Sequence, residues 1–265
     1  MTTDGAIFEC RDVRYSYQGR FPALCGVDLT IRAGQRVALV GANGSGKSTL
    51  LNLLDALSFA DAGTVRFCGT ELTEDAFRDE AFSTAFRKRV GLVFQNPDVQ
   101  LFCPTVREDV AFGPLQLGDA LEAVEARVAS LAETLGIAGL LDRSPHQLSV
   151  GEKRKVAFAS TLAVDPEVLL LDEPTAGLDP KTSTQLIELL ARASEAGKTV
   201  VTATHDIHLL EDIADTVFVF GADKRLAGTG TPAEILANHT LLQANNLIHR
   251  HFHHSRDHRR MEPAP

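Results

Sequence analysis

Two observations predict an α/β fold with a parallel sheet. A short apolar strand at Arg36–Val40 leads through a glycine-rich loop into a helix predicted over residues 47–57. In the second half of the chain, strands and helices alternate in the order 168–171, 180–196, 199–204, 208–214 and 216–220. Such alternation is typical of βαβ units, whose crossover helices join parallel strands. The sequence therefore predicts helices packed on a buried parallel sheet.

Two further strands are predicted before the glycine loop. Residues 7–13 are strand-like, and residues 26–32 alternate apolar with polar side chains. Tyr17 lies between these strands. An aromatic side chain just upstream of a phosphate-binding loop can stack on an adenine ring, and a half-buried strand tyrosine is the alternative.

The glycine loop, residues 41–49, reads GANGSGKST and fits the phosphate-binding pattern G-x-x-x-x-G-K-[ST]. Its glycines let backbone N–H groups approach a polyphosphate, and the helix N-terminus adds partial positive charge. Lys47 suits the β- and γ-phosphates, and Ser48 suits Mg²⁺. A purely structural glycine turn is the alternative. We expect a nucleoside triphosphate to be bound by Asn43, Gly44, Ser45, Gly46, Lys47, Ser48 and Thr49.

The middle of the chain is predicted to contain one long irregular stretch. The elements around it are a strand at 64–68, a helix at 81–89, a strand at 90–94, a helix at 121–135 and a helix ending at Ala163. Residues 95–113 show no regular pattern and contain Pro97 and Pro104, with Pro114 directly after them. Loops of this length inside a compact domain are usually functional.

Asp172 and Glu173 directly follow the apolar strand 168–171. There an aspartate can hold Mg²⁺, usually through water, and an adjacent carboxylate can accept a proton from an attacking water. Two solvated carboxylates are the alternative. His205 follows the strand 199–204 in the same way, where its imidazole can reach a γ-phosphate.

The composition is that of a globular protein: 44% of the 265 residues are hydrophobic. The formal charge of −9 argues against nonspecific binding of nucleic acids or anionic membranes. No apolar run approaches the roughly 18 residues of a membrane span, and no signal peptide is expected. The cysteines lack zinc or disulfide spacing, so we expect buried free thiols, in a reducing cytosol, at Cys10, Cys25, Cys68 and Cys103.

The C-terminal end combines a short helix with a histidine-rich tail. Thr231 and Glu234 form a capping-box pattern, with Pro232 at the first helical position. Residues 249–265 are polar and show no core-forming pattern. We therefore expect a folded domain over residues 1–240 and a short flexible tail over 241–265.

The chain resembles the ATPase subunit of an ABC transporter in the order of its motifs. These are GANGSGKST, Gln95, LSVGE at 148–152, VLLLDEP at 168–174, AGLD at 176–179 and His205. The resemblance covers residues 6–238. It implies a P-loop NTPase of the ABC-ATPase fold, with a RecA-like core, an N-terminal antiparallel β-subdomain and an α-helical signature subdomain at about 97–163. It also implies an ATPase that uses ATP and Mg²⁺.

The resemblance implies a role for each motif. Residues 148–152, here termed the signature segment, depart from the usual LSGGQ at Val150 and Glu152 but keep Ser149 and Gly151, which contact the γ-phosphate in the family. Asp179 matches the D-loop, and Tyr17 the adenine-stacking aromatic. The implied catalytic residues are Lys47, Gln95, Glu173 and His205. The implied magnesium ligands are Ser48, Gln95 and Asp172.

The family arrangement implies a homodimer, or an equivalent pair, that sandwiches two ATP molecules. Each site would combine one phosphate loop with the signature segment of the other subunit. The implied partners are a transmembrane coupling protein and a substrate-binding membrane subunit, with no nucleic acid. The chain would lie peripherally on the cytoplasmic face of the cell membrane.

A narrower resemblance links residues 94–102 and 104–114 to the ATPases of energy-coupling-factor importers. In those proteins the region after the Q-loop docks on the transmembrane protein, so we expect Leu101 and Phe102 to be partly exposed. The tail resembles the ends of the cobalt/nickel members, and imidazole binds both ions well. A solvated tail or an expression remnant is the alternative for His249, His251, His253, His254 and His258.

Three other functions are alternatives to that of a cobalt/nickel importer. The nearest is the ATPase of a vitamin importer. A soluble ABC ATPase acting on DNA would carry a long coiled coil, but Lys47 and Leu148 are only 101 positions apart (148 minus 47). A GTPase would need an Asn-Lys-x-Asp motif, which the sequence lacks.

Overall fold

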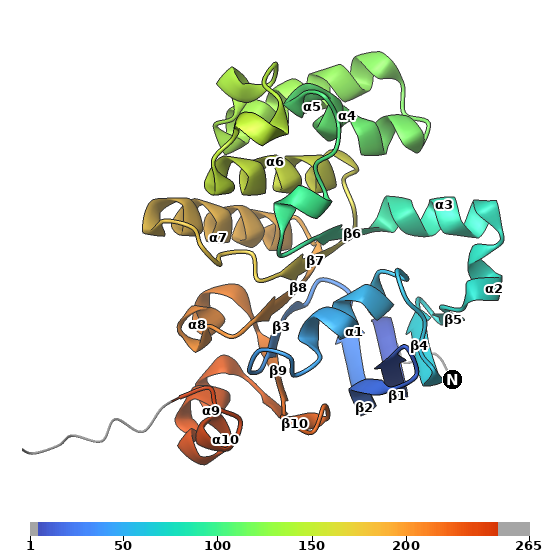
Figure 1. The fold of residues 1–265 in the computed structure, drawn as a ribbon, viewed down its shortest axis with the longest axis vertical. Coiled ribbons are helices and arrows are strands. Elements are labelled where there is room, and N and C mark those ends of the chain that lie inside the picture. Colours follow the sequence, from blue (N-terminus) through green and yellow to red (C-terminus); the bar gives the residue numbers. More distant parts are fainter. Residues whose placement is uncertain (1–4, 249–265) are drawn as a thin grey trace, which may run out of the picture.

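The computed structural model describes residues 5–248, which form two sheets covered by helices (Figure 1). The larger sheet has the strand order β10–β9–β3–β8–β7–β6. Its parallel strands are β3 (Arg36–Val40), β6 (Val90–Val93), β7 (Val168–Asp172), β8 (Thr199–Thr204) and β9 (Thr216–Phe220). The edge strand β10 (Leu226–Gly230) pairs antiparallel with β9. The predicted α/β fold is confirmed.

The smaller sheet is antiparallel and packs against the first helix. Its order is β2–β1–β4–β5, with bounds Phe21–Arg32, Ala6–Tyr17, Ala62–Phe67 and Thr70–Glu71. Helix α1 (Lys47–Leu54) lies between the two sheets and buries four leucines there. Full burial of one such side chain stabilises the fold by about 1.5–3 kcal/mol. The helix ends before the predicted residue 57 because Ala56 adopts a left-handed backbone, with φ of 52°.

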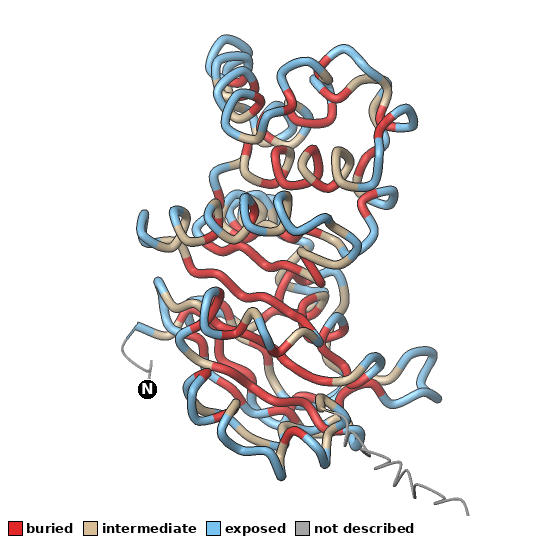
Figure 2. Tube along the Cα trace, turned by 90° about the vertical axis from the view of Figure 1, so that its left-hand side faces the viewer, coloured by how far each residue is buried: buried red, intermediate tan, exposed pale blue. Residues whose placement is uncertain are grey.

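A layer of helices covers the other face of the large sheet. Helices α6 (Val150–Ala163) and α7 (Pro180–Glu195) lie next to the sheet, and α4 (Val106–Gln116) and α5 (Leu121–Leu135) pack on α6 on the side away from the sheet. Their apolar side chains share one core cluster with β6, β7 and β8. Figure 2 shows the strands buried along most of their length, whereas the outer helices are exposed on their far sides. The predicted boundaries of a helical subdomain at 97–163 stay a prediction.

Helix α4 corrects the prediction that residues 95–113 are irregular. Thr105 caps this helix through a complete capping box with Glu108. Pro114 lies inside the helix, close to its C-terminal end. The Thr-x-x-Glu signal was present in the sequence, but the surrounding prolines had indicated a loop. Only the first part of the stretch, with a 3₁₀ turn at Pro97–Val99, lacks a long element.

The C-terminal helices pack beneath β3 and β9. They are α8 (Leu210–Ile213), α9 (Pro232–Ala237) and α10 (His239–Ala244). Leu242 is buried in this cluster, and Leu247 and Ile248 pack against it. The packed core of the described residues therefore includes residues beyond 240, within the span that the sequence predicts as tail. The five histidines of the tail lie outside the described residues.

The remaining elements are short. They are α2 (Glu74–Phe77), α3 (Glu80–Arg89) and 3₁₀ turns at Ala138–Leu140, Pro145–Gln147 and Ile207–Leu209. The four cysteines are free, but the expectation that all are buried is wrong, because Cys68 is exposed. No helix among residues 5–248 combines the length and the apolar character required to cross a membrane.

Candidate nucleotide-binding site

The predicted phosphate-loop, magnesium and catalytic residues gather at the carboxyl ends of neighbouring parallel strands. The glycine loop follows β3, Asp172 ends β7, and His205 follows β8. Gln95 lies two residues beyond β6, on the other side of β7. Ligands of open α/β sheets bind at this edge. The topology thus brings together groups that are up to 164 positions apart in the sequence (205 minus 41).

The phosphate loop depends on glycine at position 46. Gly46 immediately precedes α1 and has a φ of 111°, which side chains rarely adopt. A Cβ atom there would lie 2.5 Å from the carbonyl oxygen of Ala23 and 2.9 Å from Leu24. Any larger residue would push the loop away from β2. The loop therefore curls over the N-terminus of α1, where the helix dipole favours anions.

Lys47 is held inside this loop, with only 5% of its surface exposed. Its Nζ donates hydrogen bonds to the carbonyl oxygens of Gly41, at 2.7 Å, and Ala42, at 3.2 Å. The same atom lies 3.9 Å from Oε1 of Glu173. Burial lowers the pKa of Lys47, whereas the carboxylates of Glu173 and Asp172 raise it. The ammonium group is thus placed between the loop and the two acidic residues.

Glu173 is buried and held from three sides. Its Oε1 lies 2.9 Å from Nδ1 of His205, and its Oε2 accepts a hydrogen bond from Thr204 at 3.4 Å. Its backbone N–H donates to the carbonyl of Ala203 at 2.9 Å. The backbone of Glu173 is left-handed, with φ of 47°. Such strain costs about 1–3 kcal/mol and clusters at functional sites.

Asp172 fits a divalent cation. Its Oδ1 is buried without a hydrogen-bond partner among residues 5–248. Burial and then the charge of Glu173 raise the pKa of Asp172, while a hydrogen bond with Ser48 and the charge of Lys47 lower it. An orphaned carboxylate oxygen beside a hydroxyl suits Mg²⁺, which is usually held by one or two carboxylates, water and substrate phosphates. Gln95 is exposed at the same sheet edge.

A cavity of about 230 Å³ opens beside the glycine loop. Tyr17 lines it, is 44% exposed, and has its hydroxyl 3.1 Å from Oγ1 of Thr49. The ring of Tyr17 is therefore available to stack on a base. The sequence did not indicate four other lining residues, which are Phe21, 63% exposed, Pro22, Ala23 and Lys224. Nζ of Lys224 donates to the carbonyl of Gly44, 180 positions away, and no motif marks it.

The signature segment begins α6 on a different part of the surface. Ser149 caps this helix, and Glu152 completes the capping box. The Ser149 hydroxyl donates to Oε2 of Glu152 at 2.7 Å, and its backbone N–H donates to the same oxygen at 2.8 Å. Asp179 caps α7 in a similar way by accepting from the N–H of Thr182. None of these residues lines the described cavity beside the glycine loop.

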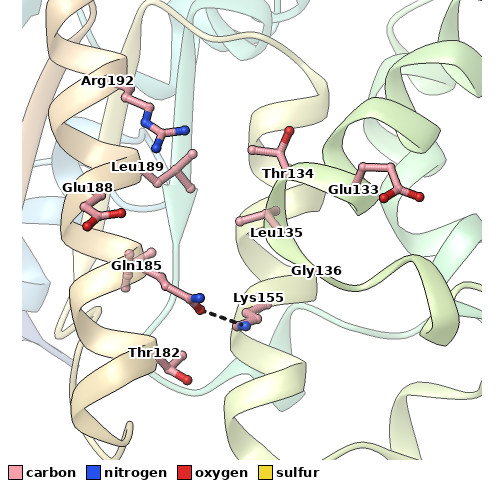
Figure 3. A pocket seen from close by; sticks show the side chains of 11 residues that line it. Glu133, Thr134, Leu135, Gly136, Lys155, Thr182, Gln185, Glu188, Leu189 and Arg192 are labelled. Carbon is pink, nitrogen blue, oxygen red and sulfur yellow. Dashed lines mark hydrogen bonds between the residues drawn. The ribbon is translucent and has the colours of Figure 1, made fainter.

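Another cavity, of about 370 Å³, lies between the C-terminal end of α5 and helices α6 and α7 (Figure 3). Side chains of both charges line it, and Lys155 on α6 donates to Gln185 on α7 at 3.2 Å. No residue of the glycine loop reaches it. It is a crevice between α7 and the helices α5 and α6, and it lacks the glycine loop of the smaller cavity.

In the loop after Gln95, one of the two residues expected to be partly exposed is buried. Leu101 is only 5% exposed and belongs to the core, so its predicted exposure is wrong. Phe102 is 66% exposed and packs edge-to-face on Phe112, with 4.9 Å between ring centroids. The Asp109 carboxylate fixes the turn by accepting from the N–H groups of Phe102 and Cys103. Together with exposed Val99, Phe102 and Phe112 form what we term the docking patch.

Comparison with known proteins places the chain among transporter ATPases. Residues 24–176 match the family model described as ABC transporter. The chain is 52% identical to the "Nickel import ATP-binding protein NikO" of Rhodobacter capsulatus, over 91% of this chain and 95% of that protein. It is 45% identical to the "Energy-coupling factor transporter ATP-binding protein EcfA" of Methanothermobacter thermautotrophicus, over 91% and 76%.

Solved structures agree in fold. The cbiO1 protein of Clostridium perfringens, part of an ABC transporter complex, superposes with a TM-score of 0.76 at 33% identity, over 92% of this chain and 96% of that one. The dimeric ATP-binding cassette MJ0796, bound to ADP and Pi, gives 0.77 at 28% identity, over 85% and 98%.

Proposed function

The chain belongs to the ABC transporter family of ATPases, and from this premise we propose that it powers the import of nickel or cobalt ions. The assignment as the ATPase subunit of an ABC importer rests on the family match and on two relatives that each align with 91% of this chain. The metal assignment rests on one observation, the 52% identity to a nickel import protein along nearly the whole chain. The alternative is another importer of the energy-coupling-factor type, such as the vitamin importer named in the sequence analysis, because the relative named as an energy-coupling factor transporter protein is 45% identical.

We propose a role for each of these residues in binding and hydrolysing ATP. Lys47 and the loop N–H groups bind the β- and γ-phosphates of ATP, and Tyr17 stacks on the adenine. Glu173 accepts a proton from the attacking water, and His205 orients the carboxylate through their 2.9 Å contact. Mg²⁺ would be held by Ser48, Asp172 and Gln95, where it would neutralise charge on the phosphates.

The same proposal requires a dimer. Ser149 and Gly151 are the expected γ-phosphate contacts, yet they begin a helix away from the phosphate-loop cavity of their own chain. A second subunit can supply them if two chains pair head to tail around two ATP molecules. The dimeric state of the similar cassette MJ0796 supports this arrangement. Closure with ATP and opening after hydrolysis would then move the membrane partners.

We further propose that the docking patch faces the membrane subunits, with the chain peripheral on the cytoplasmic side. Val99, Phe102 and Phe112 are all more than 40% exposed. A shallow cavity of about 450 Å³ continues the patch, lined by Leu115 and Leu121 among others. Exposed apolar surface of this kind marks an interaction site. No nucleic-acid partner is proposed.

Purification of the native complex, followed by identification of its membrane subunits, tests the function. The proposal expects a transmembrane coupling protein and a substrate-binding membrane subunit. It also expects Ni²⁺ or Co²⁺ uptake in cells with the intact chain and none with Lys47→Ala. Vitamin uptake without metal uptake would establish the alternative substrate. Copurification without any membrane subunit would refute a transport role.

A further inference from the structure

Arg154 links the signature helix to the catalytic edge of the sheet. It lies on α6, five positions after Ser149 (154 minus 149), and is only 5% exposed. Its Nη2 donates to the carbonyl oxygen of Gln95 at 2.7 Å, and its Nη1 donates to the carbonyl oxygen of Glu173. One guanidinium therefore joins the chain segments that follow β6 and β7 to the helix that begins at the signature segment.

The placement of this charge is not explained by stability alone. A buried guanidinium has a large desolvation cost, and burial lowers the pKa of Arg154 accordingly. The carboxylates of Glu173 and Asp172 offset this effect by raising the pKa. Nε of Arg154 is buried without a hydrogen-bond partner among residues 5–248. The guanidinium thus donates its two hydrogen bonds to the backbone carbonyls of Gln95 and Glu173, while its Nε–H donor has no partner among the described residues.

The bond to Glu173 acts on a strained backbone. Glu173 is left-handed, and its peptide groups are held by two hydrogen bonds, from its N–H to Ala203 and from Arg154 to its carbonyl. This conformation places the carboxylate against His205 and 3.9 Å from Lys47. A change in the position of Arg154 would let the strained segment relax, and the carboxylate would leave that position.

We propose that Arg154 is a positioning residue, which makes the alignment of Glu173 and Gln95 depend on the placement of the signature helix. When Ser149 engages ATP on a second subunit, α6 moves as a rigid unit, and Arg154 carries the displacement to both carbonyls. Hydrolysis would thereby wait for dimer closure. The inference rests on the roles proposed above for Glu173 and Ser149.

The test is Arg154→Lys, which keeps the charge but cannot span both carbonyls. We expect kcat of ATP hydrolysis to fall roughly 10- to 100-fold, since small misplacement of a catalytic group has effects of this size. KM and the Kd for ATP should change less than about twofold, because Arg154 does not line the nucleotide cavity. Arg127→Lys is the matched control. Its part-buried guanidinium also bonds a carbonyl, that of Ala163, but lies on α5.

A double-mutant cycle separates positioning from a merely structural role. If Arg154 acts through the Glu173 carboxylate, Arg154→Lys should not lower the residual rate of Glu173→Gln any further. An unchanged kcat in Arg154→Lys, or losses that multiply in the double mutant, would overturn the inference. If wild type does not hydrolyse ATP, or if Glu173→Gln has no effect, the proposed function itself fails.

If Arg154→Lys does not fold, a second variant and a measurement on the wild-type chain still test the inference. Arg154→Gln can reach one carbonyl and should reproduce the selective loss of kcat. In wild type, Mg–ATP should slow amide hydrogen exchange at Gln95, Asn96 and Glu173 together with that of residues 150–154. Protection of 150–154 alone would contradict the coupling.

Discussion

Nδ1 of His205 lies 2.9 Å from Oε1 of Glu173, which joins the ends of two adjacent parallel strands through their side chains. The carboxylate is 7% exposed and the imidazole 54% exposed. The accessible imidazole of His205 thus holds the buried carboxylate of Glu173 in place. The ring nitrogen not used in this contact, Nε2, remains available to a nucleotide phosphate.

Replacement of His205 by alanine should damage hydrolysis and spare binding. The variant removes the partner that orients Glu173, and such acid–base groups contribute about 10²–10⁴-fold in rate. We expect kcat to fall by about 10²-fold and the Kd for ATP to change by less than about threefold. Steady-state ATPase assays and titration with a fluorescent ATP analogue measure both. A matching loss of affinity would show that His205 acts in binding.

Lys224→Ala should weaken ATP binding. Lys224 lines the nucleotide cavity, and its ammonium group lies at the carbonyl of Gly44 inside the phosphate loop. Loss of a cation beside a triphosphate should raise Kd about tenfold, which corresponds to about 1.4 kcal/mol. The effect should shrink at high salt. Lys198→Ala is the control, since its partner Asp165 is remote from the loop. Equal Kd values for wild type and Lys224→Ala at low salt would exclude a role in binding.

Phe102→Asp should spoil assembly with membrane subunits while the isolated chain still folds and binds ATP. Phe102 is 66% exposed, so its loss should cost less than about 0.5 kcal/mol of stability. Leu101→Asp should instead unfold the chain, because it buries a charge in the core. Leu57→Asp, at an exposed leucine outside the patch, is the control. Copurification measures assembly, and normal assembly of Phe102→Asp would remove the docking argument.

Asp55 should make stability fall as pH rises. It is buried at the end of α1, and burial raises its pKa from 3.8 to about 7 against the opposing effect of Arg87. Between these values the folded chain holds a proton that the unfolded chain has lost. Each pH unit in that window therefore costs up to about 1.4 kcal/mol of stability. Asp55→Asn should flatten urea-unfolding stability between pH 4 and about 7. Exposed Asp142→Asn should not, and parallel curves for wild type and Asp55→Asn would refute the shift.

Sequence patterns predicted the buried strands best. The bounds of β3, β8 and β9 agree with the prediction because their side chains are mostly aliphatic, aromatic or threonine, the types typical of strands, and are buried on both faces. Helix α4 was missed because Gly113 and two prolines outweighed a single capping box. Leu101 and Phe102 show a further limit. Adjacent apolar residues can face opposite sides, and only the tertiary packing decides which one is buried.

The sequence predicted those residues of the candidate site that belong to short motifs. Lys47, Asp172 and Glu173 belong to such motifs, and the structure brings them within one cluster. Arg154 and Lys224 donate hydrogen bonds to backbone carbonyls of distant segments. Any residue type can supply a backbone carbonyl, so no sequence motif indicates these contacts, and only the fold reveals them.

The pairing of two chains around ATP is tested most directly by the molar mass of Glu173→Gln with Mg–ATP, measured by light scattering. Removal of the proton acceptor should preserve ATP binding and block hydrolysis, so the closed state should accumulate. We expect twice the mass of one chain with ATP, a single-chain mass with ADP, and a single-chain mass with ATP when Ser149→Arg is added. A single-chain mass for Glu173→Gln at saturating Mg–ATP would contradict the composite ATP site.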